Sequence, residues 1–424
     1  MRLRSPSRAT LVQLAATGGV AVIVGLLFGQ LIAPFDLIVF IDAGRAVLHG
    51  SNPYVSVTSQ EFRSGHAFVY PLFVAWLFAP LALLPRYVAE RLFEVASIAA
   101  ITGGARLLGR RETLIPGIVI ASATTVVGLQ MGTINGLLVG GLGVAWYFRD
   151  RHPLLCGVLL GLIGSAKLFL LPVLAWPALT RRRASTVAGV LTACGTIGLS
   201  LALGSLGPRS YLAMLTALEH NETARSWSLA SLLAGAGMGV SAATKFAPVL
   251  VGACMLEVWR HRQRLDDRQV LATVVLASLL VSPILWSSYL LLAQAALLVL
   301  DAPELYVAGT GLVSWILVTP DVASVERIAA GFVLSTALLV AIAVAGRRKR
   351  GALAGCHGGI VRLAVPKPAL ALTLFAAVPA TAGYLLLPQG LASPLPTVAL
   401  IVAAGLWASR HSATPGARAA CGPA

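Results

Sequence analysis

Apolar runs long enough to cross a lipid bilayer recur along the chain, separated by short polar breaks. Clear examples are Leu11 to Pro34, Ala184 to Gly204 and Gln269 to Leu285. A helix needs about 20 apolar residues to cross a hydrocarbon core about 30 Å thick. Backbone groups in lipid must find hydrogen-bond partners within their own segment, so these runs should be helices. The pattern therefore predicts an all-α polytopic membrane protein with about 11 to 13 transmembrane helices.

The composition agrees with a membrane protein and argues against a nucleic-acid partner. The chain has 424 residues, of which 57% are hydrophobic and 11% are charged, whereas a soluble domain carries about 25% charged residues. The net charge of +16 is gathered in short basic clusters between apolar runs, such as Arg181 to Arg183. This distribution is typical of cytoplasmic loops of membrane proteins. No polar segment is long enough to form a DNA-binding domain, and no pair of the five cysteines suggests a disulfide.

The positions of the basic clusters predict which loops share a side of the membrane. A basic N-terminus stays in the cytoplasm, so the first span leads outward to a polar loop at about residues 35–66. The later basic clusters, read in the same way, predict a second outer loop at about residues 205–226. They also predict that the segment "SPILWSSY" at residues 282–289 lies at the outer end of its span. We therefore expect three polar or aromatic stretches to converge on the non-cytoplasmic face.

One apolar run should be broken rather than span the membrane once. If every run between the first outer loop and Arg151 crosses once, one arginine cluster in that region lands outside. A re-entrant segment, which enters and leaves the membrane on the same side, would change the number of crossings and remove this conflict. The run from Cys156 to Trp176 is the candidate, because Lys167 lies in its middle and Pro172 follows. It would then consist of two half-helices that meet near the outer leaflet.

Two carboxylates follow the first span and are candidates for chemistry. Asp36 has apolar neighbours on both sides, and such surroundings raise a carboxylate pKa toward the working range of a general base. The alternative is a solvated carboxylate at a helix end. Asp42 lies six residues on, so it should occupy a different face of a helix. It would bind a sugar hydroxyl or, as we favour, cap a short helix.

Candidate cations come from the broken run and from the second outer loop. Lys167 lies within an apolar run, so its ammonium must snorkel, pair or bind an anion such as a phosphate. The loop segment "EHNETARSW" contains His220 and Arg225 beside acids, and it is either a solvated loop or a binding surface. The chain has no P-loop motif, no HExxH and no Cys/His set. We therefore expect no metal and no other cofactor.

The order of motifs resembles glycosyltransferase family 87. "FDLIVFIDAGRAVLHGSNPY" at residues 35–54 is followed by "FVYPLFVAWLFAPLALLP" at residues 68–85. A Gly-x-x-Asn segment at residues 132–135, a helix with a central lysine and a Ser-Pro-x-x-Trp segment at residues 282–286 come later. The family comprises membrane transferases of the GT-C type that use polyprenyl-phosphate sugars, among them mannosyltransferases and arabinofuranosyltransferases of actinobacterial envelopes. The chain departs from the family pattern at Leu72, Thr133 and Ser288, where Pro, Gln and His are usual.

The resemblance implies a fold, a reaction and a set of site residues. It covers about the first 290 residues and implies a membrane domain of the GT-C type. We expect this single domain to extend over residues 1–409, before a small-residue tail at residues 410–424 that should be disordered and cytoplasmic. The resemblance assigns the family's catalytic aspartate to Asp36, which would deprotonate the acceptor hydroxyl in an inverting transfer. The predicted substrate-binding residues are Asp42, Tyr54, Tyr70, Asn135, Lys167, His220, Arg225, Trp286 and Tyr289.

The predicted partners are a polyprenyl-phosphate mannose donor, a glycolipid or glycan acceptor and the bilayer of the plasma membrane. Three alternatives stay open from the sequence. The donor sugar could be arabinofuranose. A secondary transporter would also place a lysine in a broken helix, although its polar groups should gather at the midplane and the chain shows no clear inverted repeat. A non-catalytic scaffold or flippase subunit would tolerate the loss of Asp36.

Overall fold

The computed structural model describes residues 34–109, 115–260 and 265–300, together with isolated positions at 18, 19, 22, 263, 307, 310, 311 and 314. Over this part of the chain every regular element is a helix, which confirms the predicted all-α fold class. Most of the first predicted span, Leu11 to Pro34, and the whole of the predicted tail at residues 410–424 lie outside the described residues. The assignment of residues 1–409 to one domain stays a prediction.

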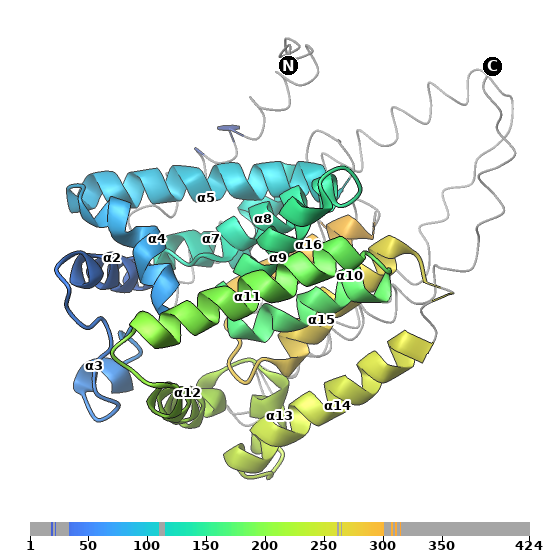
Figure 1. The fold of residues 1–424 in the computed structure, drawn as a ribbon. Helices are drawn as coiled ribbons and strands as arrows, with labels where there is room; N and C mark the ends of the chain where they lie inside the picture. The colour runs from blue at the N-terminus through green and yellow to red at the C-terminus, as the bar shows by residue number, and fades with distance from the viewer. Residues whose placement is uncertain are drawn as a thin grey trace, which may run out of the picture.

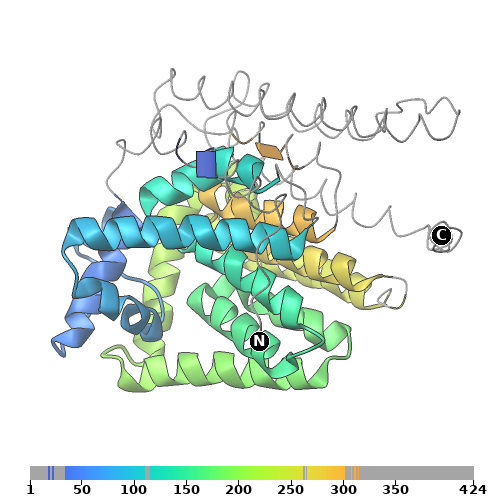
Figure 2. The ribbon, with the colours of Figure 1, turned by 90° about the horizontal axis from the view of Figure 1, so that it is seen from above.

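The helices form a bundle with the long α5 along one edge and α14 along the opposite edge (Figure 1). The view from above shows α11 on a further side of the same bundle (Figure 2). The described elements are α2 (Phe35–Leu48), α3 (Gln60–Arg63), α4 (Leu72–Ala82), α5 (Arg86–Leu108), α6 (Ile115–Ala121), α7 (Ala123–Met131), α8 (Asn135–Phe148), α9 (Pro153–Ala166), η1 (Leu168–Leu174), α10 (Ala175–Leu179), α11 (Arg183–Leu203), α12 (Pro208–Glu222), η2 (Thr223–Arg225), α13 (Leu229–Gly235), α14 (Val240–Arg260), α15 (Asp267–Val281), η4 (Ser287–Tyr289) and α16 (Leu290–Val299), where η marks a 3₁₀ helix.

Small residues allow the two closest helix pairs to form. The most extensive contacts join α9 to α11 and α5 to α8. A Cβ atom added at Gly157 would collide with the carbonyl oxygen of Ser185, and one added at Gly104 would lie 2.6 Å from the carbonyl oxygen of Val139. Glycine at these two positions therefore lets the backbones of each pair approach closely, as is common among helices in membranes.

The predicted break in the run from Cys156 to Trp176 is confirmed. Helix α9 ends at Ala166, the backbone of Lys167 is extended, and η1 and α10 continue the chain as separate short helices. The residues before and after this segment meet at one carboxylate: Asp267 accepts from Arg149 at 3.2 Å and from Arg182 at 2.7 Å. The segment thus begins and ends at the same end of the bundle, with Lys167 at its turning point.

Few of the described helices are long enough to cross a bilayer unaided. By length and composition, α11 meets the requirement on its own, and the count rises to three if the bent pairs α4–α5 and α7–α8 each act as one span. Both pairs bend by 117°. The apolar helices of the described part are otherwise shorter, among them α9 and the apolar stretch of α14. The predicted count of about 11 to 13 spans, which concerns the whole chain, stays a prediction.

Candidate active site

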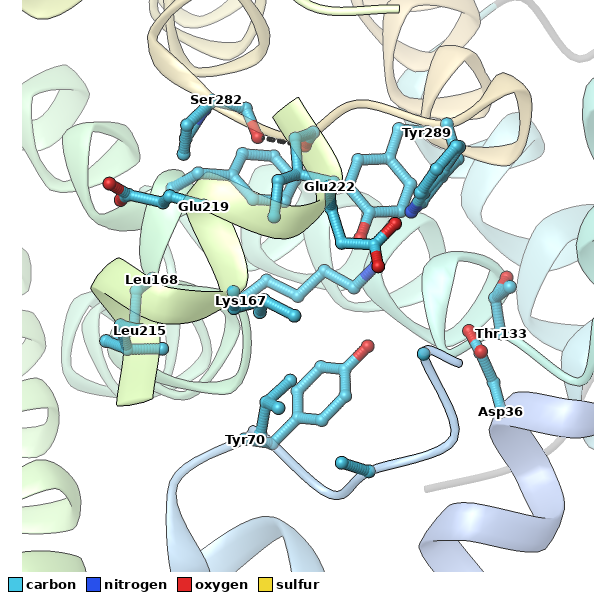
Figure 3. A pocket seen from close by; sticks show the side chains of 18 of the residues that line it. Asp36, Tyr70, Thr133, Lys167, Leu168, Leu215, Glu219, Glu222, Ser282 and Tyr289 are labelled. Carbon is cyan, nitrogen blue, oxygen red and sulfur yellow. Dashed lines mark hydrogen bonds between the residues drawn. The ribbon is translucent and has the colours of Figure 1, made fainter. Parts of the chain in front are cut away.

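A cavity of about 790 Å³ lies where the three predicted stretches meet. Its wall combines the start of α2, the loop before α4, the turning point after α9, one face of α12 and the segment between α15 and α16. Figure 3 shows the polar ends of Asp36, Tyr70 and Lys167 directed into this space. The predicted convergence of the two polar loops and the "SPILWSSY" segment is thereby confirmed.

The start of α2 is anchored so that Asp36 faces the cavity. Asp36 lies in the first turn of the helix, two residues after Pro34, where the helix dipole favours a negative charge. Leu37 and Phe40 of the same helix are fully buried, and the Phe40 ring stacks on Phe78 with 4.6 Å between ring centroids. These contacts fix the rotation of α2 and leave the carboxylate of Asp36 in the cavity wall.

The electrostatic surroundings of Asp36 suit a proton acceptor. Desolvation by burial raises the pKa of Asp36 above its ordinary value, and the positive charges of Lys167 and then His66 act in the opposite direction. A carboxylate with a raised pKa holds an abstracted proton more firmly than a solvated one does. Asp36 can therefore act as a general base toward a hydroxyl group bound in the cavity.

The glycine of the Gly-x-x-Asn segment packs the α7–α8 turn against α2. Gly132 ends α7 with a φ of +70°, in the left-handed region that glycine adopts without strain. A Cβ atom at this position would collide with Leu37. The turn can therefore lie directly against the helix that carries Asp36, and it places Asn135 at the start of α8.

Lys167 is held in place by a buried polar network from three parts of the chain. Its side chain is only 4% exposed, and its ammonium donates to Asn135 Oδ1 at 2.9 Å. The amide of Asn135 in turn donates to Ser288 Oγ at 3.1 Å. The ammonium also lies 3.6 Å from the centroid of the Tyr289 ring, which stacks on Phe169. An ammonium group has three hydrogens, so the Asn135 contact leaves donors for an anion in the cavity.

The predicted binding residues occupy three kinds of position: in the cavity wall, behind the wall and outside it. Tyr70, Lys167, Trp286 and Tyr289 line the cavity together with Asp36. Two others lie behind this wall and support it. They are Asn135, which contacts Lys167, and Tyr54, whose hydroxyl donates to the backbone carbonyl of Tyr70 at 3.0 Å.

Asp42, His220 and Arg225 lie outside the cavity wall, so the geometry gives no support to their predicted binding roles. Asp42 is exposed and pairs with Arg45 at 2.8 Å. It occupies a different face of α2 from Asp36, as the spacing of six residues predicts.

The second predicted outer loop contributes acidic residues to the cavity, where the sequence suggested basic ones. Glu219 and Glu222 line the cavity, while His220 and Arg225 are exposed. The reason is helical phase: residues 211, 215, 218, 219 and 222 follow a spacing of three to four and form one face of α12. That spacing was the available signal for the two glutamates. His66, which packs against Phe35 with 5.0 Å between ring centroids, is a third cavity residue that the sequence analysis missed.

Part of the cavity wall is apolar and lies between α12 and α14. It includes Leu215 and Leu218 of α12, Pro248 of α14 and Val281 at the end of α15. This side offers contacts to a hydrocarbon chain, whereas the side with Asp36 and Lys167 offers a base and a cation. Among the residues that the structure describes, no group of three or more His, Cys, Asp or Glu side chains is arranged to hold a metal ion.

Comparison with known proteins places the chain in a family. The family model described as glycosyltransferase family 87 matches residues 68–283, which is just over half of the chain. The chain belongs to glycosyltransferase family 87. This confirms the resemblance drawn from the motifs and the predicted class of enzyme. In this family 87 member the matched region includes Lys167, Asn135 and the glutamates of α12, but it begins after Asp36.

A curated relative of this glycosyltransferase comes from Mycobacterium tuberculosis (strain CDC 1551 / Oshkosh). It is a polyprenol-phosphate-mannose-dependent alpha-(1-2)-phosphatidylinositol pentamannoside mannosyltransferase. The two proteins are 26% identical over an alignment of 302 residues, and the alignment covers 66% of this chain and 69% of the relative.

Proposed function

We propose that this family 87 glycosyltransferase moves mannose from a polyprenyl-phosphate donor to a glycolipid or glycan acceptor. The observation that carries the proposal is that one cavity holds a candidate base, Asp36, and a buried cation, Lys167, on separate elements. The donor named for the mycobacterial relative supports a lipid-linked mannose. The apolar side of the cavity between α12 and α14 supports a donor with a hydrocarbon tail.

The two residues divide the chemistry between the acceptor and the leaving group. Asp36 takes the proton from the acceptor hydroxyl as its oxygen bonds to the anomeric carbon. The bond from that carbon to the donor phosphate breaks, and the phosphate leaves with the electron pair. Lys167 stabilises the charge that develops on the phosphate oxygens. A single displacement inverts the anomeric centre, so a β-linked donor gives an α-linked product.

The cavity should open to the non-cytoplasmic side, because the distribution of basic clusters predicts that both polar loops lie there. Ser51 and Ser210 are exposed positions in these two loops. In a variant whose native cysteines are replaced, a single cysteine at either position should react with an impermeant maleimide on intact cells. Labelling of one position without the other, or labelling only after lysis, would contradict the shared outer site.

Transfer by the purified full-length protein should depend on the lipid carrier and persist in EDTA. A monophosphate leaving group can be stabilised by cationic side chains alone. The assay supplies polyprenyl-phosphate mannose, polyprenyl-phosphate arabinofuranose or GDP-mannose with an acceptor glycolipid, and it measures the product by mass. Product from the mannose lipid supports the proposal, while product from the arabinose lipid alone would reassign the sugar. Efficient use of GDP-mannose, or transport without transfer, would refute it.

A further inference from the structure

The hydrogen-bond polarity of the Lys167 network is fixed by chemistry. An ammonium group only donates, so the atom of Asn135 that faces Lys167 at 2.9 Å must be the carboxamide oxygen. The carboxamide nitrogen therefore faces Ser288 Oγ, at 3.1 Å, and donates to it. Asn135 is completely buried, so its amide has no freedom to rotate into solvent. The donors and acceptors therefore follow one order: Lys167 donates to Asn135, and Asn135 donates to Ser288.

This order leaves the hydroxyl hydrogen of Ser288 available to the cavity. Ser288 Oγ accepts from Asn135, so its own hydrogen must point elsewhere. Within the part of the chain that the structure describes, Ser288 has no hydrogen-bond acceptor for that hydrogen. The side chain is 1% exposed yet forms part of the cavity wall. A buried donor without an acceptor is costly, and an acceptor bound in the cavity would remove that cost.

We propose that Ser288 is a second hydrogen-bond donor to the phosphate of the lipid-linked donor, and that Asn135 is the positioning residue for both phosphate contacts. The inference rests on the proposed function and adds two roles to it. Lys167 is bonded to the oxygen of the Asn135 carboxamide and Ser288 to its nitrogen, and both residues line the same cavity wall. An anionic phosphate oxygen is the acceptor for which both donors are suited. Asn135 itself lies behind the wall and does not touch the substrate.

Binding of a polyprenyl monophosphate to the purified full-length protein tests the role of Ser288. Ser288→Ala should weaken this binding by about 10- to 100-fold, as expected for the loss of a hydrogen bond to a charged group. Ser288→Thr keeps the hydroxyl and should restore most of it. Binding of the matching polyprenol, which lacks the phosphate, should stay unchanged in both variants. Ser165→Ala is the matched control, because Ser165 is a buried serine that bonds only to backbone carbonyls of α9.

A double-mutant cycle tests the positioning role of Asn135. Asn135→Asp introduces an acceptor that neutralises Lys167 and takes the Ser288 hydrogen away from the cavity, so phosphate binding should fall more than in Ser288→Ala. In the Asn135→Asp background, Ser288→Ala should cause almost no further loss. Unchanged phosphate binding in Ser288→Ala, or full additivity in the cycle, would overturn the inference. Wild-type protein that binds the phosphate lipid no better than polyprenol would instead refute the proposed function.

Discussion

Asp36→Asn should lower sugar transfer by about 10²- to 10⁴-fold, the usual effect of losing a general base. Asparagine keeps the size of the side chain and cannot accept the proton of the attacking hydroxyl. The anchoring contacts of α2 come from Leu37 and Phe40, so the variant should still fold. The measurement is the turnover of purified protein with polyprenyl-phosphate mannose, with thermal unfolding measured in parallel.

Asp42→Asn is the matched control on the same helix. Asp42 is exposed, pairs with Arg45 and lies outside the cavity wall, so its loss should change turnover only slightly. Near wild-type turnover in Asp36→Asn would remove Asp36 from the mechanism. A severe loss in Asp42→Asn with a mild one in Asp36→Asn would show that the other carboxylate is the base.

Lys167→Met should lower turnover by about 10²- to 10³-fold, the usual effect of removing one group that stabilises developing charge. Methionine retains an unbranched side chain but lacks the positive charge that faces the leaving phosphate. The loss should fall mainly on the rate of transfer with saturating donor, because the phosphate gains charge as the bond breaks. Single-turnover rates at saturating donor measure this effect.

Lys245→Met provides the control for Lys167→Met. Lys245 lies on α14 and is exposed, so removing its charge should leave single-turnover rates unchanged. The same lysine pair also separates the proposal from a general effect of charge on membrane insertion. An equal loss in both variants, or no loss in Lys167→Met, would contradict a specific role for the buried ammonium.

The features that the sequence predicted best are charges in apolar surroundings. Asp36 and Lys167 stood out because an ionised group near lipid is costly without a partner or a function. Both line the cavity. The break at Lys167 was also predictable, because a charge and a nearby proline disfavour one uninterrupted span, and the structure shows α9 ending there.

Tertiary contacts decided what the sequence could not predict. The hydrogen bonds that hold Lys167 join residues 32 and 153 positions apart, and no local pattern encodes such pairings. Asn135 was therefore assigned to the substrate, although it contacts Lys167 instead. In α12 the rotation of the helix selects Glu219 and Glu222 over His220. The spacing of these residues marks one face of α12, but the packing of α12 against its neighbours decides that this face meets the cavity.

A structure of the purified protein with bound polyprenyl phosphate is the most direct test of the site. The account predicts a phosphate oxygen within hydrogen-bonding distance of Lys167 Nζ, on the same side of the cavity as Asp36, with the tail along the apolar wall between α12 and α14. A phosphate bound outside this cavity, with Lys167 still joined only to Asn135, would contradict the assignment of the cavity as the site of transfer.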